Sequence, residues 1–213
     1  MTILRLEEPR ALERTIEILR RGGLAAFPTD TVYGIGASLA FPESLDRIYD
    51  SKLRDRDRVL PVLIASPADL LGVATKMDDD LMRLASRYWP GPLTVAVPAK
   101  PHLPSQVVAA DGTVGVRVPD HSVALVLAKH CGGALAVTSA NVSGQPPARR
   151  AGDLPPELVD RLDMVLDGGI ARGGQPSTVI GREGDTITII REGAVAAADI
   201  EAAWNQILTT TRY

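Results

Sequence analysis

The fold is set by two stretches of the chain, LAAFPTDTVYG at residues 24–34 and ALAVTSANVSG at residues 134–144. Each begins with apolar residues and then changes abruptly to hydroxyl and other polar side chains that end at a glycine. A short apolar run that is bounded by turn residues is typical of a buried strand. We therefore predict two buried strands, each ending in a polar turn that opens into a pocket.

The composition is that of an ordinary globular protein. The 213 residues are 45% hydrophobic and 23% charged, with a net charge of −3 at pH 7. No apolar run approaches the roughly 20 residues that cross a membrane, and the acidic balance disfavours a broadly basic nucleic-acid-binding surface. Cys131 is the only cysteine, which excludes an internal disulfide. Because the N-terminus also lacks an apolar signal core, we expect a cytoplasmic protein with no membrane segment.

Hydrophobic periodicity predicts helices that alternate with strands. The valines at 114, 116 and 118 alternate with Gly115 and Arg117, which is the period of a half-buried strand. Asp120 and Asp199 stand where they would cap the helices that follow them. The expected helices lie near residues 12–19, 45–49, 81–88, 122–130 and 199–208, and the expected strands at 24–27, 60–65, 93–97, 114–118, 134–137, 178–180 and 186–190. The last two strands form a plausible hairpin, so we expect a mixed α/β sheet in a single domain over residues 1–213.

Four cations recur at every second position, at Lys52, Arg54, Arg56 and Arg58. In an extended segment their side chains would point to the same side. Converging cations suit a polyphosphate, because a guanidinium offers a planar fork and an ammonium a point charge. From its spacing alone, the run fits better a solvent-exposed segment that is paired with its own aspartates.

Two further groups are candidates for a binding site. Thr113 and Arg117 share the strand face opposite the valines, where they could bind a carboxylate or phosphate; an exposed arginine on an edge strand fits the same pattern. Ser139 and Asn141 follow the second apolar stretch. Serine and asparagine are also common turn and capping residues, so a purely structural role remains open for them.

Several kinds of functional site are excluded because the sequence lacks the motifs that they require. The chain has neither a Gly-x-x-x-x-Gly-Lys-Ser/Thr loop nor a Gly-x-Ser-x-Gly elbow. His102, His121 and His130 do not have metal-ligand spacing, so no side-chain metal site is expected. His130 and Cys131 are adjacent, and neighbours do not readily form a nucleophile–base pair.

The two stretches, together with Lys52-Leu53-Arg54 and Ser177-Thr178-Val179, resemble the motifs of the YrdC family, the threonylcarbamoyl-AMP synthases. The motifs occur in the family's order between about residues 12 and 193. The resemblance implies an α/β fold with a twisted mixed sheet, flanking helices and an open central cleft. It also implies synthesis of threonylcarbamoyl-AMP from L-threonine, bicarbonate and ATP, with release of pyrophosphate. A downstream threonylcarbamoyl transferase system would then modify the adenosine next to the anticodon of certain tRNAs.

The resemblance also assigns roles to individual residues. Lys52 and Arg54 would be catalytic. ATP would be bound by Lys52, Arg54, Arg58, Thr113, Ser139, Asn141, Pro147 and Arg191, and L-threonine by Thr31, Arg117, Val137 and Ser177. Mg²⁺ would enter with ATP rather than on side-chain ligands.

The chain departs from the family pattern at three positions. Asp55 and Val59 stand where many members have proline, and Leu63 stands where some have a histidine that contacts threonine. Its length resembles the single-domain form of the family, with only a C-terminal helix near 199–208 after the core.

Two functions other than the synthase are also consistent with the sequence. One is an RNA-binding module without enzymatic activity, although aromatics make up only 4% of the residues, too few for a base-stacking platform. Weak RNA binding by the enzyme itself also remains open. The other is a carbamoyltransferase domain that handles carbamoyl-adenylate.

Overall fold

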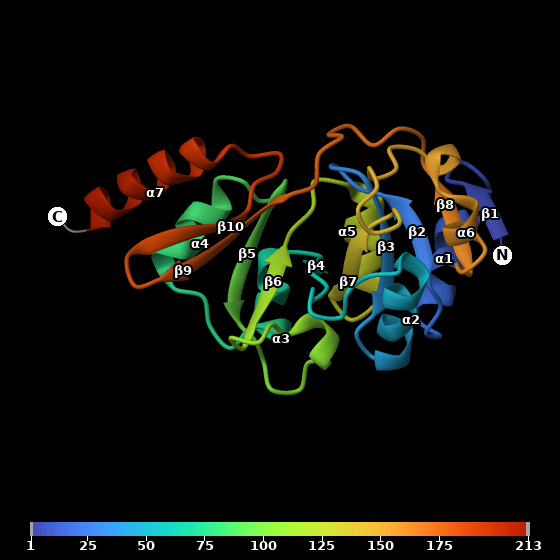
Figure 1. The fold of residues 1–213 in the computed structure, drawn as a ribbon, viewed down its shortest axis with the longest axis horizontal. Helices are drawn as coiled ribbons and strands as arrows, with labels where there is room; N and C mark the ends of the chain where they lie inside the picture. The colour runs from blue at the N-terminus through green and yellow to red at the C-terminus, as the bar shows by residue number, and fades with distance from the viewer. Residues whose placement is uncertain (1, 212–213) are drawn as a thin grey trace.

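A computed structural model describes residues 2–211, in which ten strands form one sheet in the order β1-β8-β2-β3-β7-β4-β6-β5-β9-β10 (Figure 1). The strands are β1 (Thr2–Arg5), β2 (Ala25–Pro28), β3 (Tyr33–Ser38), β4 (Val62–Ile64), β5 (Leu93–Pro98), β6 (Thr113–Arg117), β7 (Ala134–Ser139), β8 (Met164–Asp167), β9 (Thr178–Glu183) and β10 (Thr186–Arg191). Some neighbours are parallel, such as β4 and β6, and others are antiparallel, such as β5 and β6. The expected mixed α/β sheet is therefore confirmed.

Helices lie on both faces of this sheet. They are α1 (Ala11–Leu19), α2 (Pro42–Lys52), α3 (Leu70–Val73), α4 (Asp79–Ser86), α5 (Ser122–His130), α6 (Pro156–Val159) and α7 (Ala197–Thr211). The strand β2 shows why its sequence is continuously apolar: Ala25 and Phe27 join the apolar cluster beneath α1 and α5, while Ala26 joins the cluster beneath α2. A strand that is buried on both faces has no need of polar alternation. Near the β9–β10 hairpin, α4 packs against α7 (Figure 1).

The pairing of the later strands follows the sequence pattern. The predicted hairpin is confirmed as β9 and β10, which pair antiparallel with Thr186 opposite Glu183. The three valines of the half-buried strand are buried, as expected. The strands β1, β3 and β8 were not predicted. β3 lies between β2 and β7 and is antiparallel to both, and β8 lies between β1 and β2 and is parallel to both. The short apolar runs of β1 and β8 extend the sheet through neighbours that are distant in the sequence: β1 pairs with β8, and β8 pairs with β2.

Two predicted helix caps are wrong. The residue before α5 is His121 rather than Asp120, and its side chain makes no capping hydrogen bond. The last helix begins at Ala197, so Asp199 lies within its first turn instead of before it. A capping hydrogen bond is instead formed at α4, where Asp78 accepts from the amide of Leu81 at 3.0 Å.

No helix among residues 2–211 is long and apolar enough to cross a membrane. The cytoplasmic location and the single-domain organisation of residues 1–213 stay predictions.

Candidate active site

Segments that are far apart in the sequence meet around one cavity of about 90 Å³. Its wall is built from the β2–β3 turn, the ends of β6, β7 and β10, and the segment that leads into β9. Seven of the predicted site residues line it: Thr31, Arg54, Arg117, Val137, Ser139, Ser177 and Arg191. Leu63, which stands where some family members have histidine, lines it too. Because the polar strand ends converge here, the predicted pocket takes the form of this cavity.

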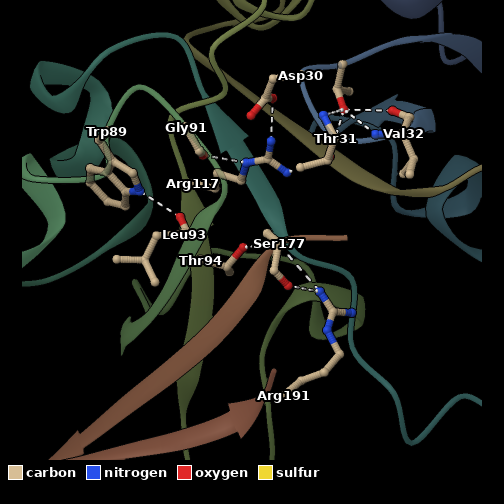
Figure 2. Close-up of polar contacts among 11 residues, drawn as sticks. Asp30, Thr31, Val32, Trp89, Gly91, Leu93, Thr94, Arg117, Ser177 and Arg191 are labelled. Carbon is tan, nitrogen blue, oxygen red and sulfur yellow. Dashed lines mark hydrogen bonds and ion pairs between the residues drawn. The ribbon is translucent and has the colours of Figure 1, made fainter. Parts of the chain in front are cut away.

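Arg117 is held on three sides at the end of β6 (Figure 2). Its Nε donates to the carbonyl of Gly91 at 2.9 Å, and Nη1 donates to Thr31 Oγ1 at 3.2 Å. Nη2 donates to the carboxylate of Asp30. Burial lowers the pKa of Arg117, and the Asp30 carboxylate opposes that shift. The ion pair therefore keeps a cation charged although only 5% of the residue is exposed.

Asp30 was not among the predicted site residues. Its only signal in the sequence is a carboxylate between two threonines in a turn that follows a buried strand. Because Asp30 lies 87 residues before Arg117, no local sequence pattern indicates that the two form an ion pair.

Hydroxyl groups face the cavity in two pairs. Thr29 Oγ1 and Thr31 Oγ1 lie 3.0 Å apart in the β2–β3 turn. Thr94 Oγ1 and Ser177 Oγ lie 2.8 Å apart between β5 and the start of β9. Thr29 and Thr94 were not predicted, and Thr94 is hidden in the sequence because it interrupts an otherwise apolar strand.

A third polar group joins the end of α2 to the end of β7. Lys52 Nζ donates to the carbonyl of Ser139 and, at 2.9 Å, to Asn141 Oδ1. Ser139 Oγ donates to the same Asn141 Oδ1 at 2.6 Å. Burial, with a smaller contribution from the charge of Arg54, lowers the pKa of Lys52 to about 7. The structure thus brings together three of the residues predicted to bind ATP, although Lys52 and Asn141 lie behind the lining of the cavity.

Arginines gather beside this group. Partial burial, followed by the charges of Arg54, Arg58 and Arg117, lowers the pKa of Arg191. Arg191 Nη2 also donates to the carbonyl of Ser177 at 2.7 Å (Figure 2). No ion pair within residues 2–211 joins Arg54, Arg58 or Arg191 to a carboxylate. Like charges held close together repel, so a bound polyanion would stabilise this arrangement.

The four alternating cations do not converge as they would in an extended segment. The segment is not extended: Lys52 is the last residue of α2, and Leu53 has a φ of 50° in the left-handed region. Arg56 turns back to α2, where it pairs with Asp46 at 2.6 Å and Asp50 at 3.0 Å and lies over the ring of Tyr49. The carboxylates of α2 therefore bind Arg56, which does not line the cavity.

Besides Lys52 and Asn141, three predicted ATP-binding residues do not line this cavity: Arg58, which is exposed, and Thr113 and Pro147. Thr113 is at the opposite end of β6 from Arg117, where it donates to Asp111 Oδ1 at 2.7 Å and lines a larger cavity of about 570 Å³ with Ala96, Gly181 and Ile190. Pro147 is half-buried in the loop after β7 and lines neither cavity. Their predicted contacts with ATP stay predictions.

The described residues contain no group of three or more His, Cys, Asp or Glu side chains that could hold a metal ion.

The arrangement matches a known family. The family described as Sua5/YciO/YrdC, telomere recombination, matches residues 17–193. This chain belongs to that family. The membership confirms the resemblance that the motifs indicated, and the family's domain covers every residue assigned to the site.

Individual relatives extend the comparison. The threonylcarbamoyl-AMP synthase of Pyrococcus abyssi is 35% identical over 97% of this chain and 62% of its own length. The putative threonylcarbamoyl-AMP synthase of Mycobacterium tuberculosis H37Rv is 34% identical over 91% of this chain and 89% of its own length. The crystal structure of P. abyssi Sua5 complexed with L-threonine matches with a TM-score of 0.87 and 32% identity, over 95% of this chain and 61% of that one.

The chain spans only part of the longer relatives. It covers 62% of the P. abyssi protein and 54% of the Bacillus subtilis threonylcarbamoyl-AMP synthase.

Proposed function

We propose that this chain is a threonylcarbamoyl-AMP synthase. It joins L-threonine, bicarbonate and ATP and releases pyrophosphate. The names of the family relatives and the L-threonine in the P. abyssi Sua5 structure support the proposal. The RNA-binding module and the carbamoyltransferase domain lose support, since the relatives at 33–37% identity carry the synthase name.

One observation carries the proposal: a hydroxyl-lined cavity that holds a buried arginine is also lined by cations that form no ion pair with a carboxylate among residues 2–211. Arg117, Thr31 and Ser177 line one part of the cavity, and Arg54 and Arg191 line another. A guanidinium suits the carboxylate of an amino acid, and hydroxyls suit its polar side chain. The neighbouring cations suit a triphosphate. The site therefore fits an amino acid and a nucleotide held next to each other.

The reaction requires positioning more than a covalent nucleophile. Bicarbonate loses hydroxide to give CO₂, and the amine of threonine adds to this CO₂ to give a carbamate and a proton, which combines with the hydroxide to form water. A carbamate oxygen then forms a bond to the α-phosphorus of ATP, and the bond from that phosphorus to the β-bridging oxygen breaks. Pyrophosphate leaves with the electron pair of that bond, and threonylcarbamoyl-AMP remains. Holding the two anions together and stabilising charge on the phosphates are the dominant contributions to such a step.

The residues divide between these tasks. Arg54, Arg58, Arg191 and the protonated form of Lys52 stabilise the triphosphate, which Mg²⁺ accompanies. Ser139 and Asn141 hold Lys52 in place and contact the nucleotide, and Thr113 and Pro147 bind it farther along. Thr31, Arg117, Val137 and Ser177 bind L-threonine. The product serves a downstream transferase that modifies tRNA, in the cytoplasm.

The decisive experiment is mass spectrometry of a short incubation with ATP, Mg²⁺, L-threonine and bicarbonate, with pyrophosphate release followed in parallel. We expect the mass of threonylcarbamoyl-AMP only when threonine and bicarbonate are both present, and far less of the corresponding product with L-valine. Folded protein that binds ATP but forms no adduct would overturn the proposal. In that case, salt-sensitive RNA binding that ATP does not displace would indicate the RNA-binding module, and use of carbamoyl phosphate would indicate the carbamoyltransferase.

A further inference from the structure

Thr94 is a buried polar residue whose position in the cavity wall is tightly defined. It is 2% exposed and lies near the start of β5, where the indole Nε1 of Trp89 donates to the carbonyl of Leu93 at 2.7 Å (Figure 2). A Cβ on Gly115 would lie 3.2 Å from Thr94 Cγ2. The methyl group of Thr94 therefore packs over a glycine that leaves it room, and its hydroxyl is left to face Ser177 in the cavity wall.

The hydroxyl pair in the β2–β3 turn has no proton left for a ligand. Thr29 Oγ1 donates its proton to the carbonyl of Val32 at 2.7 Å. The proton in the 3.0 Å contact between Thr29 and Thr31 must therefore come from Thr31. Thr31 Oγ1 also accepts from Arg117 Nη1. Toward a ligand, Thr31 can then act only as an acceptor.

The hydroxyl pair of Thr94 and Ser177 has the opposite character. Their two oxygens share a single hydrogen bond of 2.8 Å, which uses one of their two protons. Ser177 Oγ also accepts from Arg191 Nη2 at 3.4 Å, a contact that uses no hydroxyl proton. No other acceptor among residues 2–211 takes the second proton. This pair can therefore both donate to and accept from a ligand hydroxyl, which the Thr31 side cannot do.

We propose that Thr94, together with Ser177, is the residue that recognises the side-chain hydroxyl of the amino-acid substrate. The inference rests on the proposed function and deepens it. The β5 residue Val95 is paired with Val116 of β6, so Thr94 and Arg117 lie one position farther along these neighbouring strands, on the same face. Adjacent strands lie about 4.8 Å apart. An amino acid whose α-carboxylate is bound by Arg117 thus places its β-hydroxyl within reach of Thr94.

The geometry explains how threonine is distinguished from valine. A site that is built to bond a hydroxyl rejects an analogue without one, because its own buried polar groups are then left unpaired. With valine in the cavity, the free proton of the Thr94–Ser177 pair would face a methyl group. Thr94→Val removes that polar group while keeping the shape of the side chain.

The test measures kcat/KM for L-threonine and for L-valine in the wild type and in Thr94→Val. We expect the threonine-over-valine ratio to fall by about 5- to 150-fold, the range for an unpaired buried hydrogen-bonding group, while the KM for ATP stays unchanged. Thr94→Ser keeps the hydroxyl and should keep the ratio. Thr15→Val is the matched control, because it removes another buried hydroxyl, one that donates to Ala11 in α1 away from the cavity.

Several outcomes would overturn the inference. An unchanged ratio in Thr94→Val, or equal losses with both amino acids, would assign Thr94 a structural role only. A comparable change of the ratio in Thr15→Val would do the same. If Thr94→Val does not fold, Ser177→Ala takes its place, and an unchanged ratio there refutes the recognition of the hydroxyl by this pair. Failure of the wild type to form product from threonine would overturn the proposed function instead.

Discussion

At the scale of single residues, the most unusual group is the amine of Lys52. Its hydrogen-bond partners, the carbonyl of Ser139 and Oδ1 of Asn141, are uncharged. Neither partner is a carboxylate that would stabilise the charged amine. Burial therefore lowers the pKa of Lys52 to about 7. At pH 8 most of the free protein has a neutral Lys52. Phosphates placed beside it would favour the charged form and raise that pKa.

This predicts that ATP binding at pH 8 takes up protons. Because Lys52 is mostly neutral in the free protein and charged in the complex, we expect an uptake of a substantial fraction of one proton, declining as the pH falls below about 7, where Lys52 is already protonated. Calorimetric titrations in buffers of different ionisation enthalpy measure this number directly. Lys52→Arg stays charged at these pH values and should abolish the uptake. An equal uptake in wild type and Lys52→Arg would contradict the assignment.

At the scale of one element, the C-terminal end of α2 separates the cations. The amides of Leu53 and Arg54 both donate to the carbonyl of Tyr49, which closes the helix with Leu53 in the left-handed region. This reversal leaves Lys52 buried while the chain moves on toward Arg54. Glycine is the usual residue at such a position, because a Cβ makes the conformation unfavourable. Leu53 is 74% exposed and so gains little from packing.

We predict that Leu53→Gly stabilises the fold. Relief of the left-handed strain should raise the free energy of unfolding by about 0.5–1 kcal/mol, measured by urea denaturation. Leu71→Gly is the matched control: Leu71 is 60% exposed in α3, a right-handed helix, where glycine should destabilise by roughly 1 kcal/mol. A loss of stability in both variants would show that Leu53 makes a stabilising contact.

At the scale of the whole molecule, the connection 168–177 ties the two halves of the sheet together. It leaves β8, crosses over six intervening strands and enters β9 (Figure 1). On the way, the amide of Gly173 donates to the carbonyl of Asp30 at 2.9 Å, and that of Gly174 to the carbonyl of Thr31 at 2.7 Å. The connection thereby supports the turn that holds Arg117. A Cβ on Gly173 would lie 2.8 Å from the oxygen of Asp30 and 3.0 Å from Thr31 Cα.

We predict that Gly173→Ala weakens amino-acid binding selectively. The added methyl must push the connection away from the turn, because the atoms it meets belong to the backbone. We expect the KM for threonine to rise by roughly 10-fold or more, as a displacement of about 1 Å can do, with a smaller change in the KM for ATP. In Gly152→Ala, the new methyl meets nothing within 4 Å, so both values should stay at the wild-type level. Equal changes in the two KM values of Gly173→Ala would contradict this role.

Much of the fold and part of the site could be predicted from the sequence. The apolar runs before residues 28 and 138 indicated buried strands with polar ends, and the hairpin near residue 184 indicated antiparallel pairing. These features are local: the period of the side chains and the chemistry of the turns determine them. The family motifs placed Thr31, Arg117 and Ser177 at one site, and the structure brings all three to the same cavity.

Only the tertiary structure decided the direction and the partner of each polar group. Arg56 alternates with Arg54 in the sequence, yet the turn at Leu53 sends it to the carboxylates of α2. The pairs of Arg117 with Asp30 and of Thr94 with Ser177 join segments that lie 87 and 83 residues apart. Such pairs depend on which strands become neighbours, and a pattern that repeats every two or four residues contains no information about that. The sequence by itself therefore determined which strands end in polar residues, and the sheet order determined which of those residues meet.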